Sequence, residues 1–198
     1  MVACWSVKGG AGVSVVAASL AQRLASDHGG ALLVDLGGDQ PDLTGVPAHH
    51  HAGVSEWLAA GDDAPVDALA RLEVQLPGGV SLLTRGHGPL EPGARLDVLL
   101  ALLGGAGRPV VVDCGTPLAA SALGCGAGEV ALATAAAATR SLLVIRPCVV
   151  SLRRAMGAPL RPSGVVVVSE TGRALDGGDV AQVLDVEIVA EVAVDPAV

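Results

Sequence analysis

A glycine-rich turn near the N-terminus constrains the fold of this chain more than any other feature. The turn has the sequence Val7-Lys8-Gly9-Gly10-Ala11-Gly12-Val13-Ser14, and it separates the apolar run 2–7 from a helical pattern at 15–25. In a strand–turn–helix unit of this kind, glycines let successive backbone N–H groups converge on one point, and the helix N-terminus adds the positive end of its dipole. The stretch therefore predicts a phosphate-binding turn in an α/β fold.

The turn resembles the deviant Walker A loop of the ParA/MinD family of P-loop ATPases, whose pattern is Lys-Gly-Gly-x-Gly-Lys-Ser/Thr. Six of the seven positions fit or are free, and the seventh, the phosphate-binding lysine, is Val13, so the P-loop is degenerate. The resemblance implies that ATP or ADP and Mg²⁺ are the cofactors, and that Lys8 reaches across a dimer interface to the partner's nucleotide. The nucleotide-binding positions it implies are Gly9, Gly10, Ala11, Gly12, Val13, Ser14 and Val15.

Val13 removes the charged donor that a P-loop lysine offers to the β- and γ-phosphates. A charge-assisted hydrogen bond contributes roughly 1.5–3 kcal/mol, so its loss should weaken nucleotide binding by about ten- to a hundred-fold. The backbone amides, Ser14 and Lys8 remain. We therefore expect nucleotide binding to survive in a weakened form.

Two aliphatic runs, 31–36 and 109–115, each predict a buried parallel strand that delivers an aspartate at its end. Ligands of open α/β sheets sit at the carboxyl ends of the strands, so both ends should border the glycine turn. In the second run, Asp113 is followed by glycine, which is the Walker B arrangement for a carboxylate beside Mg²⁺; the alternative is a helix cap. Ser14 and Asp113 are the predicted metal site.

The first run also resembles the second motif of the family, a strand that ends in Asp-x-Asp. Asp35 matches the first aspartate, whereas Gly37 replaces the second, which helps to position the attacking water. Asp39 follows two residues later and would substitute only if the loop were remodelled. The resemblance implies that Asp35 lies in the nucleotide-dependent switch of the family, and that Asp35 and Lys8 are the catalytic positions. We expect ATP hydrolysis near background.

Apolar runs alternate with helical patterns at least five times along the chain. This alternation predicts a three-layer, doubly wound, mainly parallel sheet with helices on both faces. The 198 residues suit a single domain, 1–198, which we expect to lack the extended C-terminal helices of its relatives. A Rossmann dinucleotide site fits poorly, because Val15 stands where Gly-x-Gly-x-x-Gly needs its last glycine.

Charge and composition exclude several classes of protein. A net charge of −8 with twelve Lys and Arg speaks against strong DNA binding, and the cluster Arg153, Arg154 and Arg161 fits a solvated helix face better than a nucleic-acid contact.

We find no signal peptide and no transmembrane segment. The four cysteines form no C-x-x-C pair and are interpreted as buried free thiols of a cytoplasmic protein. They are Cys4, Cys114, Cys125 and Cys148.

Three further stretches carry weaker signals. The run His49 to His51 favours a solvated loop over a metal site, because three adjacent side chains cannot all face one ion from a regular element. Trp57 favours a core anchor over a partner contact. In the family, the strand that corresponds to 164–170 often ends in an adenine-reading asparagine, which Ser169 and Glu170 replace here.

Two functions follow from the resemblance. The first is a ParA/MinD-like protein that positions or partitions cellular cargo through nucleotide-linked dimerisation, with weak or absent ATP hydrolysis. It would form a homodimer and bind a protein partner or cargo adaptor. The alternative is a nucleotide-independent pseudo-ATPase scaffold that localises or assembles a pilus or secretion machine at the cell pole, as in the TadZ/CpaE group.

Overall fold

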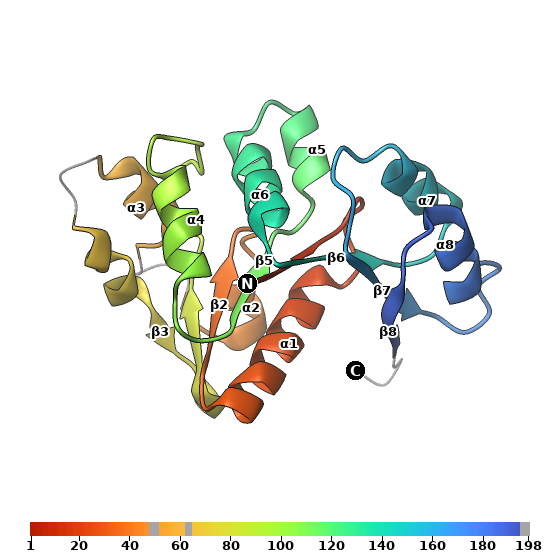
Figure 1. The fold of residues 1–198 in the computed structure, drawn as a ribbon, viewed down its shortest axis with the longest axis horizontal. Helices are drawn as coiled ribbons and strands as arrows, with labels where there is room; N and C mark the ends of the chain where they lie inside the picture. The colour runs from red at the N-terminus through yellow and green to blue at the C-terminus, as the bar shows by residue number, and fades with distance from the viewer. Residues whose placement is uncertain (48–51, 62–64, 195–198) are drawn as a thin grey trace.

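The strands form one eight-stranded sheet in the computed structural model, which describes residues 1–47, 52–61 and 65–194 (Figure 1). The strand order is β3-β4-β2-β5-β1-β6-β7-β8, and every neighbouring pair is parallel except β3 and β4. The mainly parallel sheet predicted from the apolar runs is therefore confirmed. The strands are β1 (Val2–Trp5), β2 (Ala31–Asp35), β3 (Val74–Gln75), β4 (Val80–Leu83), β5 (Val110–Asp113), β6 (Arg140–Ile145), β7 (Gly164–Ser169) and β8 (Ile188–Ala193).

Helices cover both faces of the sheet, as the alternating pattern predicted. Figure 1 shows α4, α6 and α7 on one side and α1 on the other. The α-helices are α1 (Val13–His28), α2 (Gln40–Thr44), α3 (Val54–Ala59), α4 (Leu96–Gly104), α5 (Pro117–Ala122), α6 (Gly126–Ala137), α7 (Val149–Met156) and α8 (Gly177–Leu184). The segment 66–72 forms two separate 3₁₀ turns, Val66–Ala68 and Ala70–Leu72. None of the helices in the described ranges is long and apolar enough to cross a bilayer.

The two faces of the sheet bury two separate apolar layers, because successive side chains of a strand point to opposite faces. In β1, Ala3 and Trp5 pack with the residues of α4 and α6, whereas Cys4 packs with those of α1. The core is aliphatic apart from two tryptophans. The indole N–H of Trp5 donates to Ser141 Oγ at 3.0 Å, so its single polar group is satisfied inside the core.

Helix α1 contacts the sheet through small side chains spaced four residues apart. Its buried positions are Val13, Ala17, Ala21 and Ala25, which form one ridge of the helix. Alanines at these positions let the helix lie close to the strands. Glycines in the left-handed conformation stand at both ends, Gly12 with φ 89° and Gly29 with φ 79°.

The predicted burial is correct for Trp57 and wrong for two of the cysteines. Trp57 is buried, and the guanidinium carbon of Arg95 lies 3.9 Å from its ring centroid. Cys4 and Cys114 are buried, but Cys125 is exposed and Cys148 is half-buried. The last two lie at the N-termini of helices rather than in strands, which explains the difference. The run at 49–51 lies outside the described residues.

Replacement of Leu143 by alanine should destabilise the fold strongly. Leu143 is a fully buried residue of β6, so Leu143→Ala removes apolar contacts and leaves a cavity, at a cost of about 2–5 kcal/mol. Leu123 has an exposed fraction of 85%, so Leu123→Ala is a matched control that should change stability by less than about 0.5 kcal/mol. The free energies of unfolding in urea test both. Equal effects would contradict the assignment of β6 to the core.

Candidate functional site

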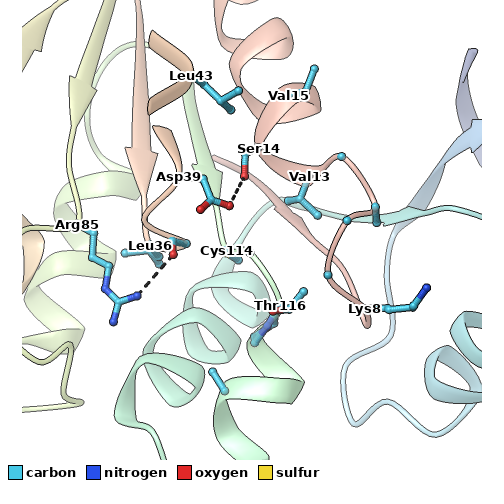
Figure 2. Close-up of a pocket in the computed structure, with 18 of the residues that line it drawn as sticks. Lys8, Val13, Ser14, Val15, Leu36, Asp39, Leu43, Arg85, Cys114 and Thr116 are labelled. Atoms are coloured by element: carbon cyan, nitrogen blue, oxygen red, sulfur yellow. Dashed lines mark hydrogen bonds between the residues drawn. The ribbon is translucent and has the colours of Figure 1, made fainter. Parts of the chain in front are cut away.

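The glycine turn between β1 and α1 forms the floor of an open cavity of about 500 Å³ (Figure 2). Gly10 and Gly12 have φ values of 75° and 89°, a backbone conformation that side chains disfavour. A Cβ added at Gly9 or Gly10 would meet no atom within 4 Å. The turn is thus a bare backbone surface, which suits the close approach of an anion such as phosphate.

The loops that follow the neighbouring strands form the walls of this cavity. Lys8 and all the predicted nucleotide-binding positions, 9–15, line it. The loop after β2 adds Leu36, Gly37 and Asp39, and the loop after β4 adds Arg85, while the loop after β5 adds 114–117. Ligands of open α/β sheets bind at this edge, so the structure brings the glycine turn and both predicted strand ends together.

Val13 lies in the wall of the cavity and does not fill it. Its side chain has an exposed fraction of 6% and packs in the apolar layer between α1 and the sheet, with Val168 among the residues of that layer. A hydrophobic side chain at the first position of the helix is therefore accommodated by the core. The structure provides no charge from this position.

Asp35 and Asp113 lie side by side below the cavity, at paired positions of β2 and β5. Both are fully buried, and neither lines the cavity. The Oδ1 atom of Asp113 accepts from the Gly115 N–H at 3.0 Å, and the Oδ1 atom of Asp35 accepts from the Gly38 N–H at 2.6 Å. Backbone amides hold both carboxylates in place at the strand ends.

Gln40 connects the three motifs that the sequence singled out. Its Nε2 donates to Asp113 Oδ2 at 2.8 Å and to the Ser14 carbonyl at 2.9 Å, and its backbone N–H donates to Asp35 Oδ2 at 3.2 Å. The side chain is fully buried, and its Oε1 has no hydrogen-bond partner among the described residues. Sequence reasoning missed Gln40, and the only signal was its place in the loop expected to border the turn.

Asp39, rather than residue 37, faces the glycine turn. Gly38, with φ 100°, redirects the chain after β2, and the Asp39 Oδ2 accepts from Ser14 Oγ at 3.5 Å (Figure 2). Gly37 lies closer to the buried end of β5 than Asp39 does, because a Cβ added at Gly37 would stand 3.5 Å from Asp113 Oδ1.

The oxygen groups around Ser14 fit a hydrated magnesium ion that also binds phosphate. Mg²⁺ prefers hard oxygen ligands and keeps several waters, and the Ser14 hydroxyl and the Asp39 carboxylate both face the cavity. Asp113 lies below them; burial raises its pKa, and the hydrogen bonds from Gln40 and from the Ser14 hydroxyl offset part of this rise. Within the described ranges no group of three His, Cys, Asp or Glu side chains could hold a metal by itself. Phosphate oxygens and water would have to complete such a site.

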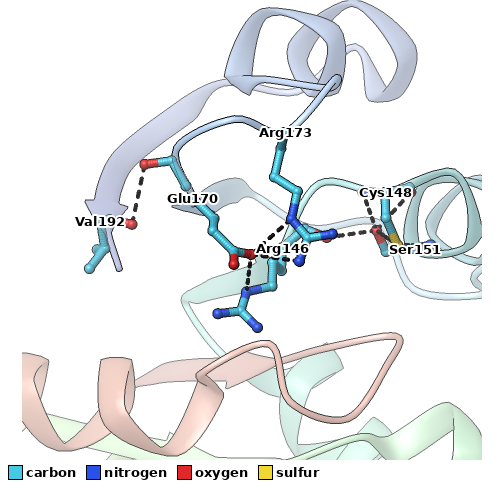
Figure 3. Close-up of polar contacts among 7 residues, drawn as sticks. Arg146, Cys148, Ser151, Glu170, Arg173 and Val192 are labelled. Atoms are coloured by element: carbon cyan, nitrogen blue, oxygen red, sulfur yellow. Dashed lines mark hydrogen bonds and ion pairs between the residues drawn. The ribbon is translucent and has the colours of Figure 1, made fainter. Parts of the chain in front are cut away.

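A smaller cavity of about 190 Å³ lies on the other side of the turn, against the loop between β6 and α7. Lys8 borders it and points away from the Ser14–Asp39 pair (Figure 2). There the Ser151 hydroxyl and N–H lower the pKa of Cys148, with a further contribution from the charge of Lys8. The carboxylate of Glu170 accepts from Arg173 Nε at 2.8 Å within the loop after β7 (Figure 3). The same carboxylate lies 3.7 Å from Arg146 Nε, and this ion pair connects the loops after β6 and β7.

Burial raises the pKa of Asp35 to about 7, against the N–H groups of Gly38 and Gln40, and the charge of Asp113 adds to the rise. Burial also raises the pKa of Asp113. Two adjacent carboxylates in a region closed to solvent disfavour double ionisation. The pair therefore retains protons at a higher pH than exposed aspartates do.

Comparison with known proteins identifies the fold. No protein-family model and no curated protein sequence matches the chain, but solved structures do. The MinC:MinD cell-division complex of Aquifex aeolicus matches with a TM-score of 0.76 and 19% identity, over 98% of this chain and 81% of that one. The septum site-determining protein MinD of Pyrococcus horikoshii, complexed with Mg-ADP, matches with a TM-score of 0.73 and 20% identity, over 98% and 81%.

A putative plasmid partition protein of Borrelia burgdorferi bound to AMPPNP matches with a TM-score of 0.66 and 14% identity, over 99% of this chain and 87% of that one. The chain has the ParA/MinD fold. The α/β class expected from the sequence resemblance is thereby confirmed.

The stability of the protein should fall as the pH rises from about 4 to about 7. Folded Asp35 keeps its proton up to about pH 7, whereas the unfolded residue loses it near 3.8, so the folded state binds more protons in this window. The free energy of unfolding should drop by up to about 4 kcal/mol through this residue and level off above pH 7.

Urea unfolding at pH 4 and pH 8 measures this difference, and Asp35→Asn should reduce it. Asp113 acts in the same direction, so part of the difference remains in the variant. A wild-type protein that is equally stable, or more stable, at pH 8 would contradict the burial of an ionisable Asp35.

Replacement of Gln40 by methionine should destabilise the protein by about 1–3 kcal/mol, because Asp113 Oδ2 and the Ser14 carbonyl lose their donor inside the protein. Methionine has a similar length and makes no comparable hydrogen bond. Gln182 is exposed on α8, so Gln182→Met is the matched control and should have little effect. Thermal and urea unfolding measure both variants. A neutral Gln40→Met would show that the link among the three motifs contributes nothing to stability.

Proposed function

We propose that this chain binds ATP or ADP with Mg²⁺ in the cavity above the glycine turn and uses the nucleotide to control a homodimer that positions cellular cargo. The open backbone cradle of the turn is the observation that carries the proposal. Its supports are the ParA/MinD fold and the nucleotides bound in two of the similar structures, Mg-ADP and AMPPNP. Bound Mg²⁺ would neutralise phosphate charge.

Hydrolysis is expected to be slow or absent. No cation extends from position 13, and residue 37 carries no carboxylate to orient water. Removal of groups that stabilise the charge on a transferring phosphoryl commonly reduces the rate by about 10² to 10³. Asp39, which faces Ser14, is the carboxylate best placed to recover part of this loss.

Dimerisation is proposed from the position of Lys8. Its side chain is exposed and points away from the Ser14–Asp39 pair of its own cavity (Figure 2). Such a lysine is available to the nucleotide of a second copy, as the sequence resemblance implies. A protein partner or cargo adaptor would then distinguish the dimer from the monomer, and the net charge of −8 disfavours DNA as the main partner.

The second candidate is a nucleotide-independent scaffold of the TadZ/CpaE kind. It is favoured by two observations, the burial of Val13 in the apolar core and the engagement of both Asp113 oxygens by Gln40 and Gly115. A protein that does not bind nucleotide would tolerate both of these features. The two candidates differ in a single measurable property, the affinity for Mg-ATP.

Calorimetric titration of Mg-ATP should give a dissociation constant in about the micromolar range, with dimer formation in analytical ultracentrifugation. Val13→Lys should tighten binding by about tenfold, because it restores a charged donor at the wall of the cavity. Val98→Lys adds the same charge on an exposed face of α4 and should leave binding unchanged. No heat at millimolar ATP, in the wild type and in Val13→Lys alike, would support the scaffold instead.

A further inference from the structure

The cavity above the glycine turn contains few positive charges for a polyphosphate site. Among the described residues that line it, the cationic side chains are Lys8 and Arg85, and the acidic ones are Asp39 and Asp42. Lys8 points toward the loop between β6 and α7, away from the Ser14–Asp39 pair (Figure 2). Arg85 is therefore the cation on the side of the cavity where the loop after β2 lies.

The side chain of Arg85 lies along the backbone of that loop. Its Nη1 is 3.5 Å from the carbonyl oxygen of Gly37, and a Cβ added at Gly38 would stand 3.7 Å from its Cδ. The guanidinium is only partly buried, and no carboxylate among the described residues forms an ion pair with it. Most of its donors remain available to a ligand.

The backbone that carries Arg85 is held by the start of α3. The Ser55 N–H donates to the Arg85 carbonyl at 2.9 Å, and the Val54 N–H donates to the Thr84 carbonyl at 2.9 Å. These two bonds attach the end of β4 to a helix that packs in the core through Trp57. The backbone at Arg85 is thus held in place without contact from any ligand.

Glu56 secures the residues that follow Arg85. Its carboxylate accepts from the N–H groups of His87 at 2.8 Å, Gly88 at 2.9 Å and Gly53 at 2.7 Å. Burial alone would raise the pKa of Glu56, but these donors lower it to about 2, so the carboxylate stays ionised at neutral pH. These bonds hold the segment that carries Arg85 before a ligand binds, so that binding loses little energy to reorganisation of this segment.

The geometry indicates which end of a nucleotide would meet Arg85. In P-loop proteins the metal held by the hydroxyl of the loop bridges the β- and γ-phosphates. Ser14 supplies that hydroxyl here and faces Asp39 in the loop after β2. The terminal phosphate would therefore lie beside this loop, on the side that Arg85 borders.

We propose that Arg85 binds the terminal phosphate and makes the site prefer ATP to ADP, in place of the cation that Val13 cannot supply. A guanidinium suits this role because its planar fork can donate two parallel hydrogen bonds to phosphate oxygens. This inference rests on the proposed nucleotide binding. It goes further, since it assigns the preference for the triphosphate to one residue outside the P-loop.

Calorimetric titrations with a non-hydrolysable ATP analogue and with ADP, both with Mg²⁺, test the inference. Arg85→Gln should weaken binding of the analogue by about ten- to a hundred-fold and binding of ADP by less than about threefold. Arg85→Lys should retain part of the affinity for the analogue, because it keeps the charge and loses the fork. The matched control is Arg23→Gln, which removes the same charge from an exposed site near the middle of α1 and should change neither constant.

The outcomes separate the two proposals. If the wild type binds neither nucleotide, the proposed function fails and Arg85 has no such role. If the wild type binds both and Arg85→Gln weakens them equally, or leaves the analogue unaffected, only the inference about Arg85 is overturned. Unfolding midpoints establish that each variant is folded. Should Arg85→Gln not fold, Arg85→Lys decides, because an unchanged ratio of the two affinities would then contradict the role of the fork.

Discussion

The hydrogen bond from Gln40 to the buried carboxylate of Asp113 is the interaction on which the geometry of the site depends. The two residues are 73 positions apart, and the same amide group also donates to the backbone at Ser14. Because the bond is inside the protein, breaking it would leave a carboxylate oxygen without a donor in a region closed to water. The glycine turn, the loop after β2 and the end of β5 are therefore held as one unit.

This unit is built around acidic side chains, although its proposed ligand is an anion. Asp35, Asp39 and Asp113 lie within or below the cavity, and the P-loop lysine that would offset them is absent. For Asp35, the N–H groups of Gly38 and Gln40 offset only part of the effect of burial, which raises its pKa. Such an arrangement favours a ligand that arrives with its own divalent cation over a bare anion.

The regular elements and the general location of the site were predictable from the sequence, because their signals are local. The run 31–36 and the run 109–115 are continuous and aliphatic, and a parallel sheet places both strand ends at one edge. The contacts of Gln40 and Arg85 were not predictable. Each depends on how separate loops fold toward each other, and neither residue stands in a recognisable motif. The same holds for Cys125 and Cys148, whose exposure follows from helix ends that apolar content does not reveal.

The alanine ridge of α1 affects the position of the glycine turn, although none of the alanine side chains lines the cavity. Ala17, Ala21 and Ala25 present only methyl groups to the sheet, so the separation between helix and strands is near the minimum that packing allows. A bulkier residue there would push the helix outward, and the glycine turn, which is continuous with its first residue, would be lifted with it. The position of the glycine turn that forms the cavity floor is consequently determined by residues up to three helical turns away from it.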